Sequence, residues 1–280
     1  MKNAIIDIGS NSVRLLCNGQ KIIENTQLAE GLISSGCLKK EAMERTILAV
    51  KHLKDLALNK GVKNVYAFAT EAVRAAKNGK EFISALQKEN IDIELISPQQ
   101  ESQCGYLGAY TSGTVAIIDI GGASSELTVG DENGIIYSHS LPLGSVRLKD
   151  YSLDKNLQYQ YAKERVKEYG SVPKFDKLIS IGGSVSVIKA VSLKLEPYDA
   201  NVIHNSVMTY GEMNTTVEAI LAVKADERKF IPGIHPKKIL VAPAGGVLAL
   251  AIMEYLGVNQ LTLSEKDNLE GYAILKGMEI

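Results

Sequence analysis

The chain has 280 residues, of which 45% are hydrophobic and 22% charged, a composition typical of a folded globular protein rather than of a disordered segment. Its formal net charge of −1 argues against a general nucleic-acid binder, which usually shows a basic footprint. The 3 cysteines, Cys17, Cys37 and Cys104, form no CxxC pair and cannot all be bridged, so neither a disulfide framework nor a zinc cluster is expected.

The first predicted elements form a meander of antiparallel strands, and the same pattern returns later in the chain. The hexapeptide AIIDIG stands at residues 4–9 and again at 116–121. Each copy is rich in β-branched residues, ends in glycine and precedes a small-residue turn. Two extended runs follow in each case, over 13–17 and 20–26 and then over 126–129 and 134–141. Tight turns between such runs predict antiparallel strands, and the recurrence is an internal repeat.

Helices and strands alternate after each meander. The first half predicts a helix over 39–60, a strand over 65–69, a helix with Thr70 as N-cap, a strand over 91–96 and a helix after Pro98. The second half predicts helices over 157–169, from the turn 182–184 to about 193, over 210–224 and over 236–256. It also predicts strands over 178–181 and 260–263, and a terminal helix from about Lys266.

This order indicates an α/β protein of two domains, each a mixed sheet flanked by helices, with an interdomain cleft. A loop at TSGT places the N-terminal domain over 1–113 and the C-terminal domain, with extra helices, over 114–280. Apolar runs such as 116–120 are shorter than the roughly 20 residues that a membrane span needs. The first residues lack the apolar region of a signal peptide. We therefore expect a cytoplasmic protein that binds no membrane.

The turn after each AIIDIG copy has a definite chemistry. Asp7 and Asp119 stand at strand ends, and Gly/Ser turns follow. Glycine lets the backbone approach a ligand, and successive backbone N–H groups bind anions. A carboxylate holds Mg²⁺ directly or through water. The alternative is that each aspartate only caps its turn, but two such turns with extra small polar residues favour a clamp for a phosphate chain.

Several stretches carry a family resemblance. They are DIGSNSVRLL (7–16), GLISSGCL (31–38), AFATEAVRAAKNG (67–79), ISPQQESQCGYLGA (96–109), DIGGASSEL (119–127), LPLGSVRL (141–148) and ISIGGSVSVIKAV (179–191). In this order they resemble the Ppx/GppA exopolyphosphatases and guanosine pentaphosphate phosphohydrolases of the sugar kinase, actin and heat-shock chaperone superfamily. The resemblance implies two ribonuclease-H-like (actin-like ATPase) domains, the first with a phosphate-1 loop and the second with a phosphate-2 loop.

The resemblance also implies metal-assisted hydrolysis of a terminal phosphoanhydride. The family's general base, a glutamate at the start of a helix, falls on Glu101. A carboxylate there would orient or deprotonate water for in-line attack on phosphorus. Taken alone, an N-terminal glutamate is also favoured by the helix dipole.

The remaining site residues follow from the same resemblance. The acids that would hold Mg²⁺, or Mn²⁺ in its place, are Asp7, Asp119 and Glu126. The groups that would bind phosphate oxygens are Ser10, Asn11, Ser12, Arg74, Gly121, Gly122, Ser124, Ser125 and Arg147. Gly182 and Gly183 match the turn that faces the nucleoside in the superfamily. The alternatives stay open at this point: Glu126 as an outward strand residue, either arginine in a solvated or helix-pairing role, and the glycines as a plain helix start.

The sequence also departs from the family pattern. An arginine expected two residues after Glu101 is Gln103, and another expected before the first long helix is Gln27. Each lost arginine removes a possible bidentate phosphate ligand. Three functions therefore remain: a hydrolase of polyphosphate or guanosine pentaphosphate, a small-molecule kinase of the same superfamily, and a phosphate or nucleotide sensor without turnover. The helix-rich second half offers a surface for a homodimer.

Overall fold

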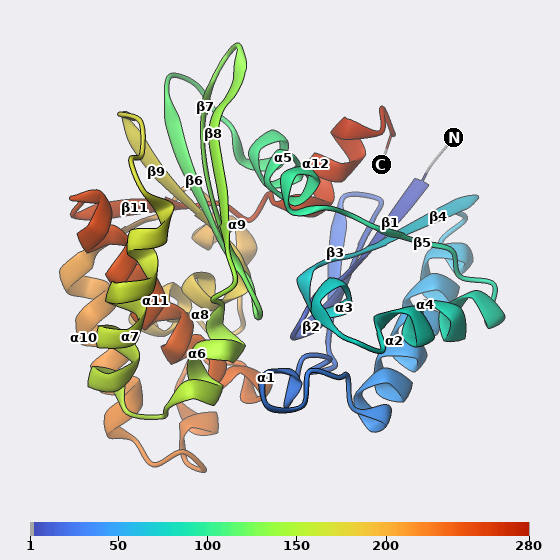
Figure 1. Ribbon diagram of the computed structural model, residues 1–280, viewed down its shortest axis with the longest axis horizontal. Coiled ribbons are helices and arrows are strands. Elements are labelled where there is room, and N and C mark those ends of the chain that lie inside the picture. The colour runs from blue at the N-terminus through green and yellow to red at the C-terminus, as the bar shows by residue number, and fades with distance from the viewer. Residues whose placement is uncertain (1–2, 280) are drawn as a thin grey trace. The chain divides into compact units, whose positions relative to one another are not determined.

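The computed structural model describes residues 3–279, and the chain divides into two compact units (Figure 1). The first unit is Met1–Gly108 together with Asn268–Ile280, and the second is Ala109–Asp267. Each unit contains a mixed sheet with helices packed on it, which confirms the predicted α/β class. Within residues 3–279, no helix is long and apolar enough to cross a membrane.

The sheet of the first unit has the strand order β3-β2-β1-β4-β5. Its strands are β1 (Asn3–Ile8), β2 (Ser12–Cys17), β3 (Gln20–Asn25), β4 (Asn64–Ala69) and β5 (Ile93–Leu95). The first three are antiparallel and form the predicted meander, whereas β4 and β5 run parallel to β1. The helices are α1 (Leu32–Ser35), α2 (Lys40–Asn59), α3 (Glu71–Ala75), α4 (Gly79–Lys88), α5 (Pro98–Ala109) and α12 (Asn268–Leu275).

Strand β1 is buried on both faces, and its alternation decides where Asp7 points. Ala4, Ile6 and Ile8 belong to one core cluster, in which side chains of α2 and α4 also pack. Ile5 belongs to another cluster, together with Cys104 of α5 and Tyr272 of α12. Successive side chains of a strand point to opposite faces, so Asp7 lies on the face of Ile5, which α5 and α12 cover.

The sheet of the second unit has the order β10-β11-β9-β6-β7-β8. Its strands are β6 (Val115–Ile120), β7 (Ser125–Asp131), β8 (Gly134–Leu141), β9 (Lys177–Ile181), β10 (Val207–Thr209) and β11 (Gln260–Leu263). Strands β6, β7 and β8 repeat the antiparallel meander, and β9 runs parallel to β6. The helices are α6 (Ser145–Tyr151), α7 (Lys155–Arg165), α8 (Gly183–Ser192), α9 (Ala200–Ile203), α10 (Tyr210–Ala222) and α11 (Val241–Leu256).

The long predicted elements are confirmed, and the differences fall on short ones. Helices α1, α4, α6 and α9 and strand β10 were not predicted. The helix expected over 236–256 is a 3-10 turn, Pro236–Lys238, followed by α11, and the one expected over 157–169 ends in a 3-10 turn, Val166–Tyr169. Thr70 occupies the N-cap of α3, but its side chain makes no capping hydrogen bond.

The terminal helix α12 does not pack where the sequence placed it. The expected second domain ran to residue 280, whereas α12 packs in the first unit. The Tyr272 ring stacks on Phe68 with ring centroids 4.6 Å apart, and the Tyr272 hydroxyl donates to the Glu94 carboxylate at 2.7 Å. Lys276 also donates to Glu94, at 3.0 Å. The chain therefore returns to its first unit to cover the face of the sheet that bears Ile5.

Gly271 on α12 allows the closest backbone approach in this packing. A Cβ atom there would lie 1.7 Å from the Cys104 carbonyl oxygen. We expect Gly271→Ala to destabilise the protein by about 1–3 kcal/mol, because the backbone of α5 or α12 must move. Thermal unfolding followed by circular dichroism measures the change. The control is Gly211→Ala, where a Cβ meets nothing within 4 Å; an equal fall in the two melting midpoints would contradict the steric account.

Candidate active site

Asp7 is neutralised inside the first unit by an arginine on the neighbouring strand. The register pairs Asp7 of β1 directly with Arg14 of β2, so both side chains share one face. The Arg14 Nε donates to Asp7 Oδ2 at 3.0 Å, and a second guanidinium nitrogen contacts the same oxygen. Asp7 is only 3% exposed, so the pair is weakly screened.

The turn after Asp7 is held by the segment that follows β3. The Gly9 N–H donates to the Ser12 carbonyl oxygen at 3.0 Å, which closes the turn. The Ala29 N–H donates to the Ser10 carbonyl at 2.9 Å, and the Gln27 N–H donates to the Asn11 carbonyl at 3.0 Å. These bonds use carbonyl oxygens of the turn, so its conformation is fixed by residues distant in sequence. Gln27, which stands where an arginine was expected, thus contributes its backbone to this turn.

Glu101 stands in the first turn of α5, and a capping box sets that turn. The Gln100 N–H donates to Ser97 Oγ at 3.2 Å, and the Ser97 N–H donates to Gln100 Oε1 at 2.9 Å. Pro98 suits the first helical position, where an N–H has no partner within the helix. The Glu101 N–H donates to the Ser97 carbonyl at 2.9 Å. The segment Ser97–Glu101 therefore specifies locally where the helix begins and where Glu101 lies.

Arg74 of α3 binds Glu101. Its terminal nitrogen Nη2 donates to Glu101 Oε2 at 3.2 Å and to Glu71 Oε2 at 2.8 Å, and Nη1 donates to the Ile96 carbonyl at 2.6 Å. The sequence alone left Arg74 open between a phosphate clamp and a helix-pairing role, and in this structure its guanidinium contacts two carboxylates and a carbonyl.

The thiol of Cys104 reports the charge on this face of the first unit. Burial, followed by the negative charges of Asp7 and Glu101, raises the pKa of Cys104 to about 12. Both carboxylates therefore lie close enough to Cys104 to repel its thiolate. Asp7 and Glu101, although far apart in the chain, both act on the same α5 thiol.

In the second unit the repeat places a carboxylate where the first unit has Arg14. The register pairs Asp119 of β6 with Glu126 of β7, as it pairs Asp7 with Arg14. Glu126 is 3% exposed, and the Ser140 hydroxyl donates to its Oε1 at 2.7 Å. Two acids directly opposite each other repel unless a cation lies between them. This arrangement differs in charge from that of Asp7.

Asp119 also lies beside the turn at Gly182. That glycine has a φ of +97°, and a Cβ there would lie 3.1 Å from Asp119 Oδ1. The missing side chain lets the backbone of this turn approach the carboxylate closely. Oxygen donors of this kind suit Mg²⁺, which keeps several waters and binds through one or two carboxylates. Within residues 3–279 there is no group of three or more His, Cys, Asp or Glu side chains that could hold a metal ion. A Mg²⁺ ion at Asp119 and Glu126 would therefore need water or substrate oxygens as further ligands.

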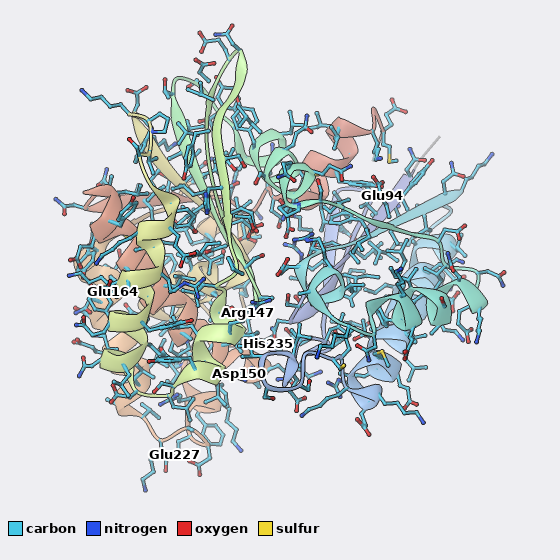
Figure 2. All side chains as sticks on the ribbon, in the orientation of Figure 1. Glu94, Arg147, Asp150, Glu164, Glu227 and His235 are labelled. Carbon is cyan, nitrogen blue, oxygen red and sulfur yellow. The ribbon has the colours of Figure 1, made fainter. Side chains whose placement is uncertain are left out.

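The turn after Asp119 accepts hydrogen bonds from the start of α6. The Ser145 N–H and hydroxyl donate to the Gly121 carbonyl at 2.9 and 3.0 Å, and the Val146 N–H donates to the Gly122 carbonyl at 2.8 Å. Arg147, marked in Figure 2, donates from its backbone N–H to the Gly122 carbonyl at 3.2 Å and from its side chain to the Pro142 carbonyl at 3.3 Å. The LPLGSVRL segment thus holds the turn that follows Asp119 in place.

Gly144 lets this support come close. A Cβ there would lie 2.6 Å from the Gly122 carbonyl oxygen and 2.7 Å from that of Gly121. We expect Gly144→Ala to displace the turn and to lower the phosphate hydrolysis that the family resemblance implies by about 10- to 100-fold, since small misplacements at a reacting centre have effects of this size. Steady-state measurement of kcat/KM tests this prediction, with Gly211→Ala as the control variant. Unchanged kcat/KM would show that the turn tolerates the displacement.

The two serines of this turn differ in their surroundings. Ser124 is 3% exposed. Ser125 is fully buried, and its hydroxyl forms a 2.8 Å hydrogen bond with the Tyr169 hydroxyl inside the core. Strand alternation turns this hydroxyl to the face opposite Glu126, so the predicted phosphate contact at Ser125 would fall to its backbone N–H and stays a prediction.

The Gly182–Gly183 turn has a lysine that the sequence reading missed. Lys238 Nζ donates to the Gly183 carbonyl at 3.2 Å. His235, labelled in Figure 2, lies close by, and burial followed by the positive charges of Lys238 and Lys237 lowers its pKa. Arg14 and Glu71 were also not singled out. The repeat carried a signal for Arg14, because it aligns Arg14 with Glu126, whereas nothing local marked Lys238.

A family model and several known proteins match nearly the whole chain. A family model described as the Ppx/GppA phosphatase family matches residues 8–275. A bifunctional 3-dehydroquinate synthase/phosphatase of Fusobacterium nucleatum is 32% identical over 99% of this chain and 46% of that protein. Exopolyphosphatase 2 of Mycobacterium tuberculosis is 24% identical over 97% of both chains. The guanosine-5'-triphosphate,3'-diphosphate pyrophosphatase of Aeromonas hydrophila is 27% identical over 93% of this chain and 56% of that protein.

Solved structures share the fold. The Aquifex aeolicus member of the Ppx/GppA family has 27% identity and a TM-score of 0.79, with coverage of 100% of this chain and 99% of that one. An exopolyphosphatase from Cytophaga hutchinsonii has 22% identity and a TM-score of 0.87, with coverage of 100% and 99%. The chain spans about half the length of the Fusobacterium and Aeromonas relatives.

Proposed function

This chain belongs to the Ppx/GppA phosphatase family, and we propose that it is a Mg²⁺-dependent phosphohydrolase that releases the terminal phosphate of inorganic polyphosphate, guanosine pentaphosphate or both. The observation that carries the proposal is the buried Glu101 carboxylate, oriented by Arg74 at the start of α5. Relatives named exopolyphosphatase and guanosine pentaphosphate pyrophosphatase support these substrates.

Glu101 would accept the proton of the attacking water. A carboxylate within hydrogen-bonding reach of a water orients a lone pair toward phosphorus and takes up the proton as the new P–O bond forms. Its bond to Arg74 limits its rotation, so less orientation has to be gained when substrate binds. The proton is transferred from water to a Glu101 oxygen, and the leaving group departs with the electron pair of the broken P–O bond.

The two turns would bind the phosphate oxygens. Backbone N–H groups and hydroxyls around Ser10 to Ser12 and Gly121 to Ser124 are suited to this, because small residues admit close approach. Asp119 and Glu126 would hold Mg²⁺, which when bound neutralises charge on the transferring and leaving phosphate groups. The Asp7 carboxylate accepts a hydrogen bond from Arg14, and its role as a further Mg²⁺ ligand stays a prediction.

Phosphate release from long and short polyphosphate, guanosine pentaphosphate and ATP, each in Mg²⁺ or EDTA, tests the function. Release that requires metal supports the hydrolase, and the order of kcat/KM values names the substrate. Transfer of phosphate from ATP to a sugar or small acid would instead show a kinase. The replacements Gln27 and Gln103 motivate a sensor as second candidate. Saturable binding of these ligands without phosphate release in Mg²⁺ or Mn²⁺ would establish the sensor and overturn the hydrolase.

A further inference from the structure

We propose that Tyr169 is a positioning residue for the start of β7: its buried hydroxyl holds Ser125, and so sets where the turn residue Ser124 and the predicted metal ligand Glu126 lie. The inference rests on the function proposed above, in which this turn binds phosphate and Glu126 holds Mg²⁺. It assigns a task to a residue of the hydrophobic core, which would act on the site only through Ser125.

The hydroxyl groups of Tyr169 and Ser125 form two hydrogen bonds inside the second unit, and the number of hydrogens decides which group donates. The two hydroxyl oxygens are 2.8 Å apart, and the Tyr169 hydroxyl also donates to the Ser125 carbonyl oxygen at 3.2 Å. Each hydroxyl has one hydrogen. Because the Tyr169 hydrogen is used at the carbonyl, the Ser125 hydroxyl donates in the bond between the two oxygens. Tyr169 therefore holds both the side chain and the backbone of Ser125.

Tyr169 keeps its proton and so remains a hydrogen-bond donor. The residue is 2% exposed. Burial is the main reason that the pKa of Tyr169 is raised; the hydrogen bond with Ser125 opposes this shift, and the negative charges of Glu126 and Asp119 add to it. Both acids of the predicted metal site thus act on Tyr169, although its hydroxyl bonds to the residue beside them.

The segment that carries Tyr169 is anchored by two further tyrosines. Tyr169 is the last residue of the 3-10 turn Val166–Tyr169. The Tyr137 hydroxyl of β8 donates to the Tyr169 carbonyl, and the Tyr255 hydroxyl of α11 donates to the Gly170 carbonyl. Because these bonds come from a strand and a long helix, they fix the backbone that presents the Tyr169 hydroxyl to β7.

Ser125 is the point at which this anchor reaches the site. It is the first residue of β7, it pairs with Leu141 of β8, and its side chain is fully buried. Ser124 precedes it in the turn after Asp119. Glu126 follows it with its side chain on the other face of the sheet, in register with Asp119. A shift of Ser125 would therefore move both of its neighbours, because rigid planar peptide bonds join them to it.

Tyr169→Phe should lower kcat/KM for phosphate release by about 10-fold and raise the Mg²⁺ concentration that gives half-maximal activity by about 10-fold. The ring and its packing remain, but the Ser125 hydroxyl and carbonyl lose a buried partner. Steady-state rates over a series of Mg²⁺ concentrations, well below the melting midpoint of the variant, measure both effects. Tyr159→Phe is the matched control, because the Tyr159 hydroxyl also has two partners in the second unit, Tyr210 at 3.0 Å and Glu254. It should leave both values unchanged.

A double-mutant cycle tests whether Tyr169 acts through Ser125. Ser125→Ala removes one of the two hydrogen bonds and leaves the one to the carbonyl, so it should lower kcat/KM less than Tyr169→Phe does. The double variant should lose no more than about 2-fold beyond Tyr169→Phe alone, since residues that act as a unit are not additive. Losses that multiply would show that Tyr169 does not act through Ser125. An unchanged kcat/KM and Mg²⁺ requirement in Tyr169→Phe would reduce Tyr169 to a structural residue. Either result overturns the proposal.

Hydrogen exchange separates this inference from the proposed function, because it needs neither substrate nor metal. In Tyr169→Phe, amide exchange should become faster in peptides that contain residues 121–127, whereas Tyr159→Phe should leave exchange in these peptides at the wild-type rate. This pattern supports the positioning role even if no substrate is hydrolysed. Exchange that stays unchanged over residues 121–127, or that rises equally throughout the second unit, overturns it even if the wild-type protein is an active hydrolase.

Discussion

Glu101→Gln is expected to lower kcat for phosphate release by about 10²- to 10⁴-fold while leaving substrate binding nearly unchanged. The amide keeps the size of the side chain and an oxygen that can accept from Arg74, but it cannot take up the proton of the attacking water. Loss of a group that acts only in the transition state lowers kcat rather than raising KM. The measurement is steady-state phosphate release with the best substrate, together with calorimetric binding of a non-hydrolysed analogue.

The control for this variant is Glu89→Gln, in the same unit. Glu89 forms a 2.6 Å ion pair with Lys51 and is 41% exposed, so its substitution should leave kcat at the wild-type value. Activity of Glu101→Gln within a few-fold of wild type would assign proton transfer to another group or to bulk water. A loss of binding equal to the loss of kcat would instead assign Glu101 to substrate binding.

Asp119→Asn is expected to reduce activity at ordinary Mg²⁺ concentrations by about 100-fold, equivalent to roughly 3 kcal/mol of transition-state stabilisation. The amide is a weaker ligand for a hard cation than a carboxylate, so the site would lose one of its proposed charged ligands. Raising Mg²⁺ should restore part of the activity. Glu126→Gln should behave similarly, because the register pairs the two side chains directly.

Asp131→Asn serves as the control for this second prediction. Asp131 lies at the opposite end of β7 from Glu126, where its side chain accepts the Asn133 N–H at 2.8 Å. The Mg²⁺ concentration that gives half-maximal activity should stay unchanged in this variant and rise in Asp119→Asn. An unchanged metal requirement in Asp119→Asn would place the metal elsewhere.

The difference between the two halves of the repeat is a result of the register. The sequence aligns Asp7 with Asp119, and both were expected to hold metal. The structure pairs the first with Arg14 and the second with Glu126. Asp7 thus lies opposite a positively charged side chain, whereas Asp119 lies opposite a second carboxylate. The alignment already contained this contrast, but only the pairing of the strands showed that the residues face each other.

The sequence alone predicted the local features of this protein, namely its strands, turns and helix starts. Period-2 runs of β-branched residues ending in Asp-x-Gly predicted both meanders, and Pro98 predicted the start of the helix that bears Glu101. Each of these signals acts within a few residues, through backbone sterics, turn geometry or helix capping. The family resemblance of the motifs predicted the fold class, which the structure confirms, and it assigned the role of general base to Glu101, which stays a prediction.

Contacts between distant segments were decided only by the tertiary structure. Arg74 and Glu101 are 27 residues apart, and Glu94 and Tyr272 are 178 apart. Periodicity shows which face of a helix or strand is buried, but not which other element covers it. Three features depend on such packing: the return of α12 to the first unit, the sharing of Arg74 by two glutamates, and the inward turn of the Ser125 hydroxyl. In each case the buried group or hydrogen-bond partner comes from another element, and no local sequence pattern encodes it.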